Sequence, residues 1–118
     1  IPSYRPPDAG EASLFNCVVS HNPDAAMESL SAADFAKVDL VLCGHTHGGQ
    51  ARLPLFGAFK TSSKHWKRFE WGRLAHSEGR ATMLVCSGVG ATLVNLRLNC
   101  PPEALWIEFT GLRRHETA

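Results

Sequence analysis

The stretch VDLVLCGHTHGGQ, residues 38–50, joins a short apolar run to a turn rich in histidine and glycine. Its first six residues are typical of a buried β-strand. A second apolar run, residues 14–20, also reads as a buried strand and ends directly before His21. Between the two runs, Asn22 followed by Pro23 predicts a helix start, because asparagine caps helices well and proline fits their first position. The order strand, helix, strand favours two parallel strands joined by a right-handed crossover, and therefore an α/β fold.

The rest of the chain adds further predicted elements. The helical region should continue to about Lys37, with a break near Ser31. Residues 81–87 read as a third strand. The alternating apolar pattern of residues 104–110 predicts a last strand with two unlike faces.

Length and composition limit the chain to one small domain, since 118 residues with 44% hydrophobic content can bury a modest core. We expect an extended linker over residues 1–13, a structured part over residues 14–110 and a tail over residues 111–118. The net charge of +1 gives no general attraction to nucleic acid.

The cysteines and the apolar runs bear on the compartment. Four widely spaced cysteines contain no CxxC pair, and three of them, Cys17, Cys43 and Cys86, lie in apolar runs. This pattern predicts buried free thiols in a reducing compartment, although an even number leaves disulfides open. No apolar run reaches about 18 residues, and no signal-peptide pattern is present. We expect a cytoplasmic location.

Three histidines follow the two predicted parallel strands. His21 comes after the first, and His45 and His47 come after the second. The carboxyl ends of parallel strands share one edge, where ligands bind in open α/β sheets, so the three imidazoles should meet there. Gly44 and Gly48 allow the turn that brings an HxH pair to one side. Imidazole is a common ligand of divalent metal ions, although a single histidine at a strand end is more often structural.

The same segment resembles a known family. Residues 38–50, preceded by SHNPD at residues 20–24 and followed by NCPPE at residues 99–103, look like the calcineurin-like metallophosphoesterases. The likeness is strongest to a bacterial branch of membrane-associated phosphodiesterases, and it covers roughly residues 14–110. It implies the carboxy-terminal half of a two-sheet αββα sandwich.

The resemblance also implies an activity and a set of roles. It implies a hydrolase for phosphomonoesters or phosphodiesters that uses two divalent metal ions, which could be manganese, iron, zinc, nickel or magnesium. By family pattern, His21 and His45 bind the second ion and His47 binds the first. The substrate-binding residues that we expect are Gly44, Gly48, Lys64 and Arg68, and no residue of this chain is assigned as catalytic.

This sequence departs from the family in one large respect. The amino-terminal motifs DxH, GDxxD and GNH[DE], which supply the bridging carboxylate and the catalytic histidine, are absent. Three neutral imidazoles cannot offset the charge of two divalent ions. The chain alone should therefore be inactive without an amino-terminal half, and one sandwich face should be unusually apolar, which favours pairing with another chain.

A basic, aromatic stretch runs from Lys60 to Arg73, with five cationic residues and one acid, Glu70. It could be a solvated loop whose aromatic rings pack underneath. It could also meet a phosphate substrate, possibly a phospholipid or a nucleotide-linked one, or touch a membrane as a peripheral partner. Specific nucleic-acid binding is the least favoured reading.

Two other functions remain open at this point. The chain could be a non-catalytic metal-binding or interaction module that retains only the histidines of an ancestral site. It could also be a hydrolase with one metal ion held by His21, His45 and His47, although the sequence offers no clear general base for that reaction.

Overall fold

The computed structural model describes residues 15–60, 62–75 and 81–110. The expected linker at residues 1–13 and the expected tail at residues 111–118 lie outside this part of the chain. The elements are β1 (Cys17–Val19), α1 (Pro23–Ser29), α2 (Ala32–Phe35), β2 (Leu40–Cys43), the 3₁₀ turn η1 (His47–Gly49), β3 (Arg52–Leu53), β4 (Gly57–Ala58), the 3₁₀ turn η2 (Trp66–Phe69), β5 (Gly72–Ala75) and β6 (Thr82–Val85).

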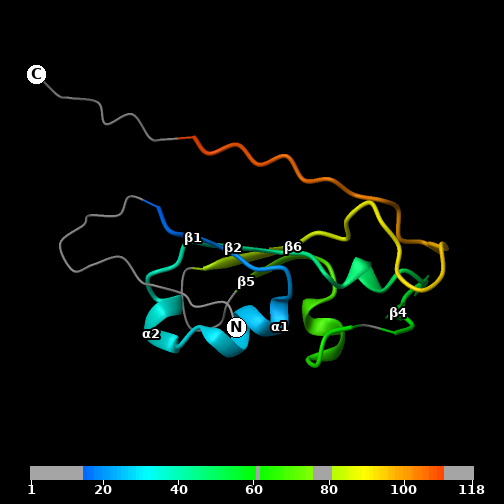
Figure 1. Cartoon of the computed structure of the whole chain (residues 1–118), viewed down its shortest axis with the longest axis horizontal. Helices are drawn as coiled ribbons and strands as arrows, with labels where there is room; N and C mark the ends of the chain where they lie inside the picture. The colour runs from blue at the N-terminus through cyan, green and yellow to red at the C-terminus, as the bar shows by residue number, and fades with distance from the viewer. Residues whose placement is uncertain (1–14, 61, 76–80, 111–118) are drawn as a thin grey trace, which may run out of the picture.

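A four-stranded sheet forms the centre of the fold, in the order β1-β2-β6-β5. The first three of these strands are parallel, and β5 runs antiparallel to β6. Figure 1 shows α1 and α2 together on one side of this sheet. The predicted strand–helix–strand unit and the α/β class are thus confirmed. Among the described residues, no helix covers the other face of the sheet.

The helical region begins and breaks where the sequence predicts. Asn22 caps α1, and its side-chain oxygen accepts a hydrogen bond from the Asp24 N–H at 2.8 Å. Pro23 is the first helical residue. Ser31 starts the second helix through a capping box with Asp34, in which each side chain bonds to the backbone of the other.

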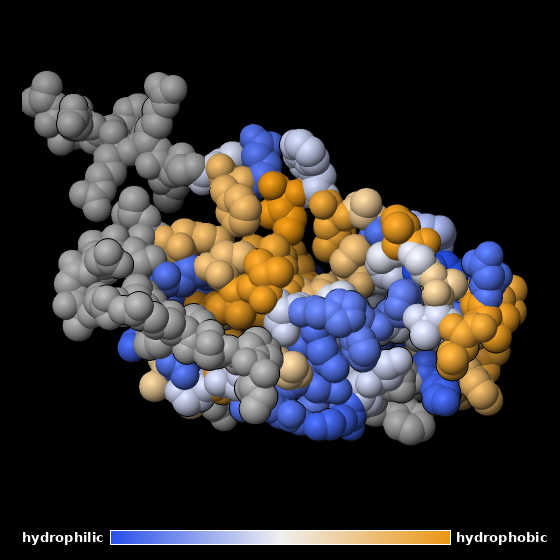
Figure 2. All heavy atoms as spheres, viewed as in Figure 1, coloured by the Kyte–Doolittle hydropathy of each residue, from blue (hydrophilic) through white to orange (hydrophobic). Residues whose placement is uncertain are grey.

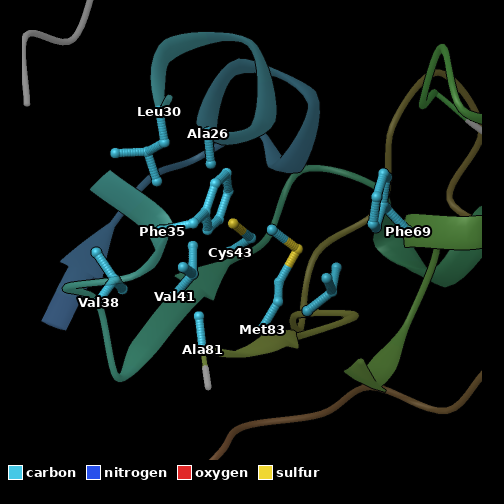
Figure 3. Close-up of a cluster of buried hydrophobic side chains, with 10 residues drawn as sticks. Ala26, Leu30, Phe35, Val38, Val41, Cys43, Phe69, Ala81 and Met83 are labelled. Carbon is cyan, nitrogen blue, oxygen red and sulfur yellow. The ribbon is translucent and has the colours of Figure 1, made fainter. Parts of the chain in front are cut away.

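The core lies between the helices and the sheet (Figure 3). Phe35 and Leu30 from the helical region pack on Val41 and Met83 from the central strands. Phe69 from η2 joins the same cluster. Burial of these side chains accounts for most of the stability of so small a fold.

Two predictions about the later part of the chain are wrong. Residues 104–110 form no strand within the described part of the chain, and their contact with the segment before β1 is made by side chains, with the Phe109 and Phe15 rings 5.1 Å apart. They run as an extended segment with Leu105, Trp106 and Phe109 exposed. Conversely, the strand β5 begins at Gly72, inside the stretch from Lys60 to Arg73 that was predicted to be a loop, and it pairs with β6 along its whole length.

The cysteine prediction holds for only part of the set. All four cysteines are free, and Cys43 is buried while Cys86 is half-buried. Cys17 is exposed, contrary to expectation. The reason is its position, since β1 is an edge strand whose first and last residues are both exposed.

Apolar side chains are exposed on the loop at residues 88–98, where Leu93 is 99% exposed, and in two further places. One lies on β1 and on the extended segment, where Val19 is 76% and Trp106 is 94% exposed. The other lies at the end of the molecule that carries β4, where Leu55 and Phe56 are exposed. Figure 2 shows apolar atoms gathered over the sheet and again at this end. No helix in the described ranges is long and apolar enough to cross a membrane.

Candidate metal centre

His21 and His45 are brought together by the ends of two neighbouring parallel strands. The ladder between β1 and β2 continues past both strands, with the Ser20 N–H donating to the Leu42 carbonyl at 2.9 Å and the Gly44 N–H donating to the His21 carbonyl at 3.1 Å. His21 therefore lies beside the start of the GHTHGGQ turn. Its ring meets the His45 ring edge to face, with centroids 5.0 Å apart.

The spacing of the two rings suits a shared metal ion. His21 Nε2 lies 3.2 Å from His45 Nδ1. Two imidazole nitrogens bound to one tetrahedral zinc ion at 2.0–2.1 Å would stand about 3.3 Å apart. The two nitrogens thus stand at a separation close to that of two ligands of one ion, and without an ion one ring donates a hydrogen bond to the other.

The turn that carries His45 and His47 is conformationally unusual. His45, His47 and Gln50 have φ values of 69°, 51° and 52°. Such left-handed conformations are uncommon for residues other than glycine and cost on the order of 1–3 kcal/mol each. They persist only where surrounding contacts enforce them, and they are concentrated at functional sites.

His47 faces a different partner from the other two histidines. Its Nδ1 lies 3.2 Å from the Gly90 carbonyl, and its Nε2 lies 2.9 Å from the Thr92 hydroxyl. With Nδ1 protonated and donating to Gly90, Nε2 has a free lone pair that accepts from Thr92. Nε2 is therefore the nitrogen that could bind a metal ion, and a carbonyl at Nδ1 orients the ring in the way that is common among metal-binding histidines.

The three imidazoles do not form one cluster. Within residues 15–60, 62–75 and 81–110, no group of three His, Cys, Asp or Glu side chains is placed to hold a metal ion. The structure brings His21 and His45 together and sets His47 against the loop at residues 88–98.

That loop is tied to the histidine turn by the Gln50 side chain and is braced internally by Arg97. Gln50 accepts a hydrogen bond from the Thr92 N–H and donates to the Val94 and Leu96 carbonyls at 3.3 and 3.4 Å. Arg97 donates to the carbonyls of Ser87 and Gly88 at 2.8 and 2.9 Å. These bonds hold Thr92 beside His47.

Glu103 anchors one end of the same loop through hydrogen bonds of its side chain. Its carboxylate accepts hydrogen bonds from the Ser87 N–H at 3.0 Å and from the Trp71 indole N–H at 2.8 Å. Desolvation acts to raise the pKa of Glu103, but these hydrogen bonds outweigh it and hold the pKa below its ordinary value of 4.5. Glu103 is therefore ionised at neutral pH and anchors the loop.

The two glycines that follow His47 serve close packing. A Cβ on Gly48 would lie 2.6 Å from the Cys100 sulfur, and a Cβ on Gly49 would lie 2.3 Å from the Ala58 Cβ. Gly48 is buried, so the structure gives it a packing role as well as the substrate role expected for it. Gly44 sits between the His21 and Cys86 carbonyls, at the level of the two facing rings.

The expected substrate contacts Lys64 and Arg68 lie toward α1. Lys64 forms an ion pair with Glu28 at 2.7 Å, and its backbone N–H donates to the buried Asp24 carboxylate at 2.6 Å. Arg68 lies over the Phe69 ring. Asp24 is occupied as an anchor for this segment, since it also accepts from the Ser63 hydroxyl at 2.7 Å.

Cys43 does not add to the ligand set. It ends β2 next to the histidine turn, but burial raises the pKa of its thiol to about 11. Metal ions bind the thiolate form, and that form is disfavoured here.

Comparison with known proteins finds relatives that are named as phosphoesterases. Phosphodiesterase YaeI of Escherichia coli (strain K12) is 42% identical over 104 residues, which is 88% of this chain and 36% of that protein. The uncharacterized metallophosphoesterase YkuE of Bacillus subtilis (strain 168) is 37% identical over 90 residues, which is 76% of this chain and 29% of that protein. The chain is related to the metallophosphoesterase family. The uncharacterized protein YpbG of Bacillus subtilis (strain 168) is also similar, at 34% identity over 101 residues, or 86% of this chain and 34% of that protein.

The metallophosphoesterase relationship concerns one part of those proteins. The chain spans about a third of the length of the curated relatives it matches. No family model matches the sequence, and no solved structure matches it.

Several residues around His47 in this chain were not singled out from the sequence. Gln50, Thr92 and Arg97 shape the surroundings of His47, and Glu103 anchors them. The NCPPE segment marks the family resemblance, but the bonds of Glu103 join residues 16 and 32 positions away. Sequence spacing alone carries no signal for such contacts.

Proposed function

We propose that this chain supplies the histidine side of a two-metal site in a phosphoester hydrolase. The observation that carries the proposal is the pair of facing nitrogens, His21 Nε2 and His45 Nδ1, at 3.2 Å. Sequence similarity to a phosphodiesterase and a metallophosphoesterase supports the reaction class.

The histidines divide between two positions. His21 and His45 would hold one divalent ion, and His47 would contribute Nε2 to the other. When bound, the two ions would polarise the phosphoryl group and stabilise the attacking and leaving oxygens. The chain's own task is to orient the three rings, and the hydrogen bond from His47 to the Gly90 carbonyl does this for the third.

The carboxylates that such a site needs are not free near the histidines. Asp24 anchors Ser63 and Lys64, Glu70 pairs with Arg52 at 2.7 Å, and Glu103 holds Ser87. We propose that the missing acidic ligands come from the part of the relatives' length that this chain does not span. On this proposal, the chain alone does not hydrolyse phosphoesters at an appreciable rate.

The fold is consistent with a site whose other ligands come from a part of the protein outside this chain. Helices cover one face of the sheet, and apolar residues such as Val19 are exposed beyond it (Figures 1 and 2). We propose that a second sheet covers this face in the longer protein, which would complete a sandwich.

The exposed face leads to a testable expectation for the chain alone. It should self-associate, because open sheet edges and apolar patches pair readily. Val19→Lys should shift the equilibrium toward monomer in analytical ultracentrifugation, whereas Ala33→Lys, at an exposed position in α2, should leave it unchanged. A strictly monomeric chain at about 100 μM would contradict the proposed open face.

The hydrolase proposal is tested with a model phosphodiester and a model phosphomonoester carrying a chromogenic leaving group. The product of the whole gene should cleave one of them with added Mn²⁺ or Zn²⁺ and lose activity with a chelator, and this chain alone should show almost none. His45→Ala should abolish the activity, while His65→Ala, whose ring packs on Phe69, should retain it. Undiminished hydrolysis after complete metal removal would rule out the proposal.

One observation favours a second candidate, a module that binds metal without catalysis. The described residues contain no group of three metal-binding side chains. The same assay separates the two candidates, since the module would bind metal through His21 and His45 and yet give no hydrolysis in the whole gene product.

A further inference from the structure

A cavity of about 190 Å³ opens beside His47 on the surface of the molecule. Its polar lining includes the side chains of Lys60, Ser62, Gln50 and Thr92. Gln50 and Thr92 were not singled out by the sequence, whereas Lys60 and Ser62 belong to the basic stretch that it left open as a phosphate contact. The expected contacts Lys64 and Arg68 do not line this cavity.

Lys60 is the cation of this cavity, and its charge is not neutralised within the described residues. Each neighbouring cation is engaged. Arg52 pairs with Glu70, Lys64 pairs with Glu28, and Arg97 is bound to backbone carbonyls. Lys60 forms no ion pair in residues 15–60, 62–75 and 81–110, and its side chain is exposed. An unpaired ammonium group at the wall of a cavity attracts an anion.

The backbone holds Lys60 close to the histidine turn. The Phe59 N–H donates to the Ala51 carbonyl at 2.9 Å. The Lys60 carbonyl approaches Gly49 so closely that a Cβ there would lie 2.9 Å from its oxygen. The position of Lys60 is thus set by the same turn that presents His47.

The hydroxyl of Thr92 connects the cavity to the metal centre. It bonds to His47 Nε2, the nitrogen assigned to a metal ion, and the Gln50 side chain fixes the Thr92 backbone. Occupation of Nε2 by a metal ion would free this hydroxyl to donate into the cavity. Ser62 offers a second hydroxyl on the cavity wall.

We propose that this cavity binds a phosphate group of the substrate, with Lys60 supplying the positive charge and Thr92 and Ser62 supplying hydrogen bonds. Lysine binds phosphate as a point charge, and hydroxyl donors complete the coordination of the oxyanion. The inference rests on the proposed hydrolase function, and it adds a residue-level site for the phosphate that the histidines alone do not provide.

The test uses inorganic phosphate and the isotope-labelled 118-residue chain. Amide chemical shifts are followed by NMR while phosphate is added at constant ionic strength. We expect the largest shifts at Gly49, Gln50 and Thr92. Lys60→Ala should weaken phosphate binding about fivefold, as the loss of one exposed charge contact of about 1 kcal/mol predicts, and Lys60→Arg should restore much of it.

Lys64→Ala is the matched control, because it removes a lysine four positions away whose charge is already paired. It should change phosphate affinity less than about twofold, since an exposed pair contributes little. Shifts centred on Lys64 and Arg68, shifts at His21 and His45 that Lys60→Ala leaves intact, or no shifts at all would each overturn the proposal.

The outcome is independent of the hydrolase test. If phosphate binding depends on Lys60 but the gene product shows no metal-dependent hydrolysis, the phosphate site is supported and the hydrolase proposal is contradicted. If the gene product shows metal-dependent hydrolysis but Lys60→Ala has no effect on phosphate binding, the hydrolase proposal is supported and the phosphate site is contradicted.

Discussion

Replacing His45 by alanine is expected to lower the affinity of the chain for Zn²⁺ or Co²⁺ by at least about 100-fold. Loss of a residue that only orients a metal ligand costs about 10–100-fold in affinity, so loss of a ligand itself should cost at least as much. The remaining nitrogen, His21 Nε2, would have lost the partner that stands 3.2 Å away. Isothermal titration calorimetry of the purified chain measures the change.

The control for this prediction is His65→Ala. His65 is exposed, and its ring packs on Phe69 at a centroid distance of 5.3 Å. Its loss should leave metal affinity within about twofold of the parent chain, because an exposed residue away from the ligands has little effect. Equal losses in the two variants would show that the histidines bind metal without a defined site, and the paired geometry would then have no functional meaning.

The local parts of the fold could be read from the sequence with good accuracy. Asn22 and Pro23 mark the start of α1, and Ser31 marks the break before α2, because caps and prolines act through bonds to residues within one turn. The parallel strands β1 and β2 follow from their continuous apolar runs. These signals lie within short windows of sequence, and the structure confirms them.

The parts that depend on distant partners could not be read in this way. The alternating pattern of residues 104–110 is that of a strand, but a strand needs backbone hydrogen bonds to a neighbouring strand, and in the described chain Phe109 meets Phe15 through the two rings while residues 104–110 join no ladder. The opposite holds for β5, whose pattern is weak but whose partner β6 is present.

The candidate site shows the same limit. The sequence marks His21, His45 and His47 because their residue type and position after strands indicate metal binding. It does not reveal that Lys64 is paired whereas Lys60 has no ion pair among the described residues, because that difference depends on Glu28, 36 positions from Lys64. Charge along the sequence therefore does not distinguish Lys60 from Lys64, and the expected substrate contact of Lys64 stays a prediction.

Gly49→Ala is expected to lower the free energy of unfolding by about 3 kcal/mol or more. Gly49 has a φ of 77°, and a side chain in this left-handed conformation costs about 1–2 kcal/mol. The added Cβ would also lie 2.3 Å from the Ala58 Cβ and 2.9 Å from the Lys60 carbonyl. Overpacking of this kind costs about 1–3 kcal/mol more, and urea denaturation followed by circular dichroism measures the sum.

Gly88→Ala separates the two costs of that substitution. Gly88 has a similar φ of 66°, but an added Cβ would meet no atom within 4 Å. It should therefore lose only the conformational part, about 1–2 kcal/mol. If the two variants lost equal stability, close packing at Gly49 would not matter. If Gly49→Ala loses more, relief of the clash must move Ala58 and Lys60 away from the turn, so the folded fraction of that variant should also bind phosphate more weakly than that of Gly88→Ala.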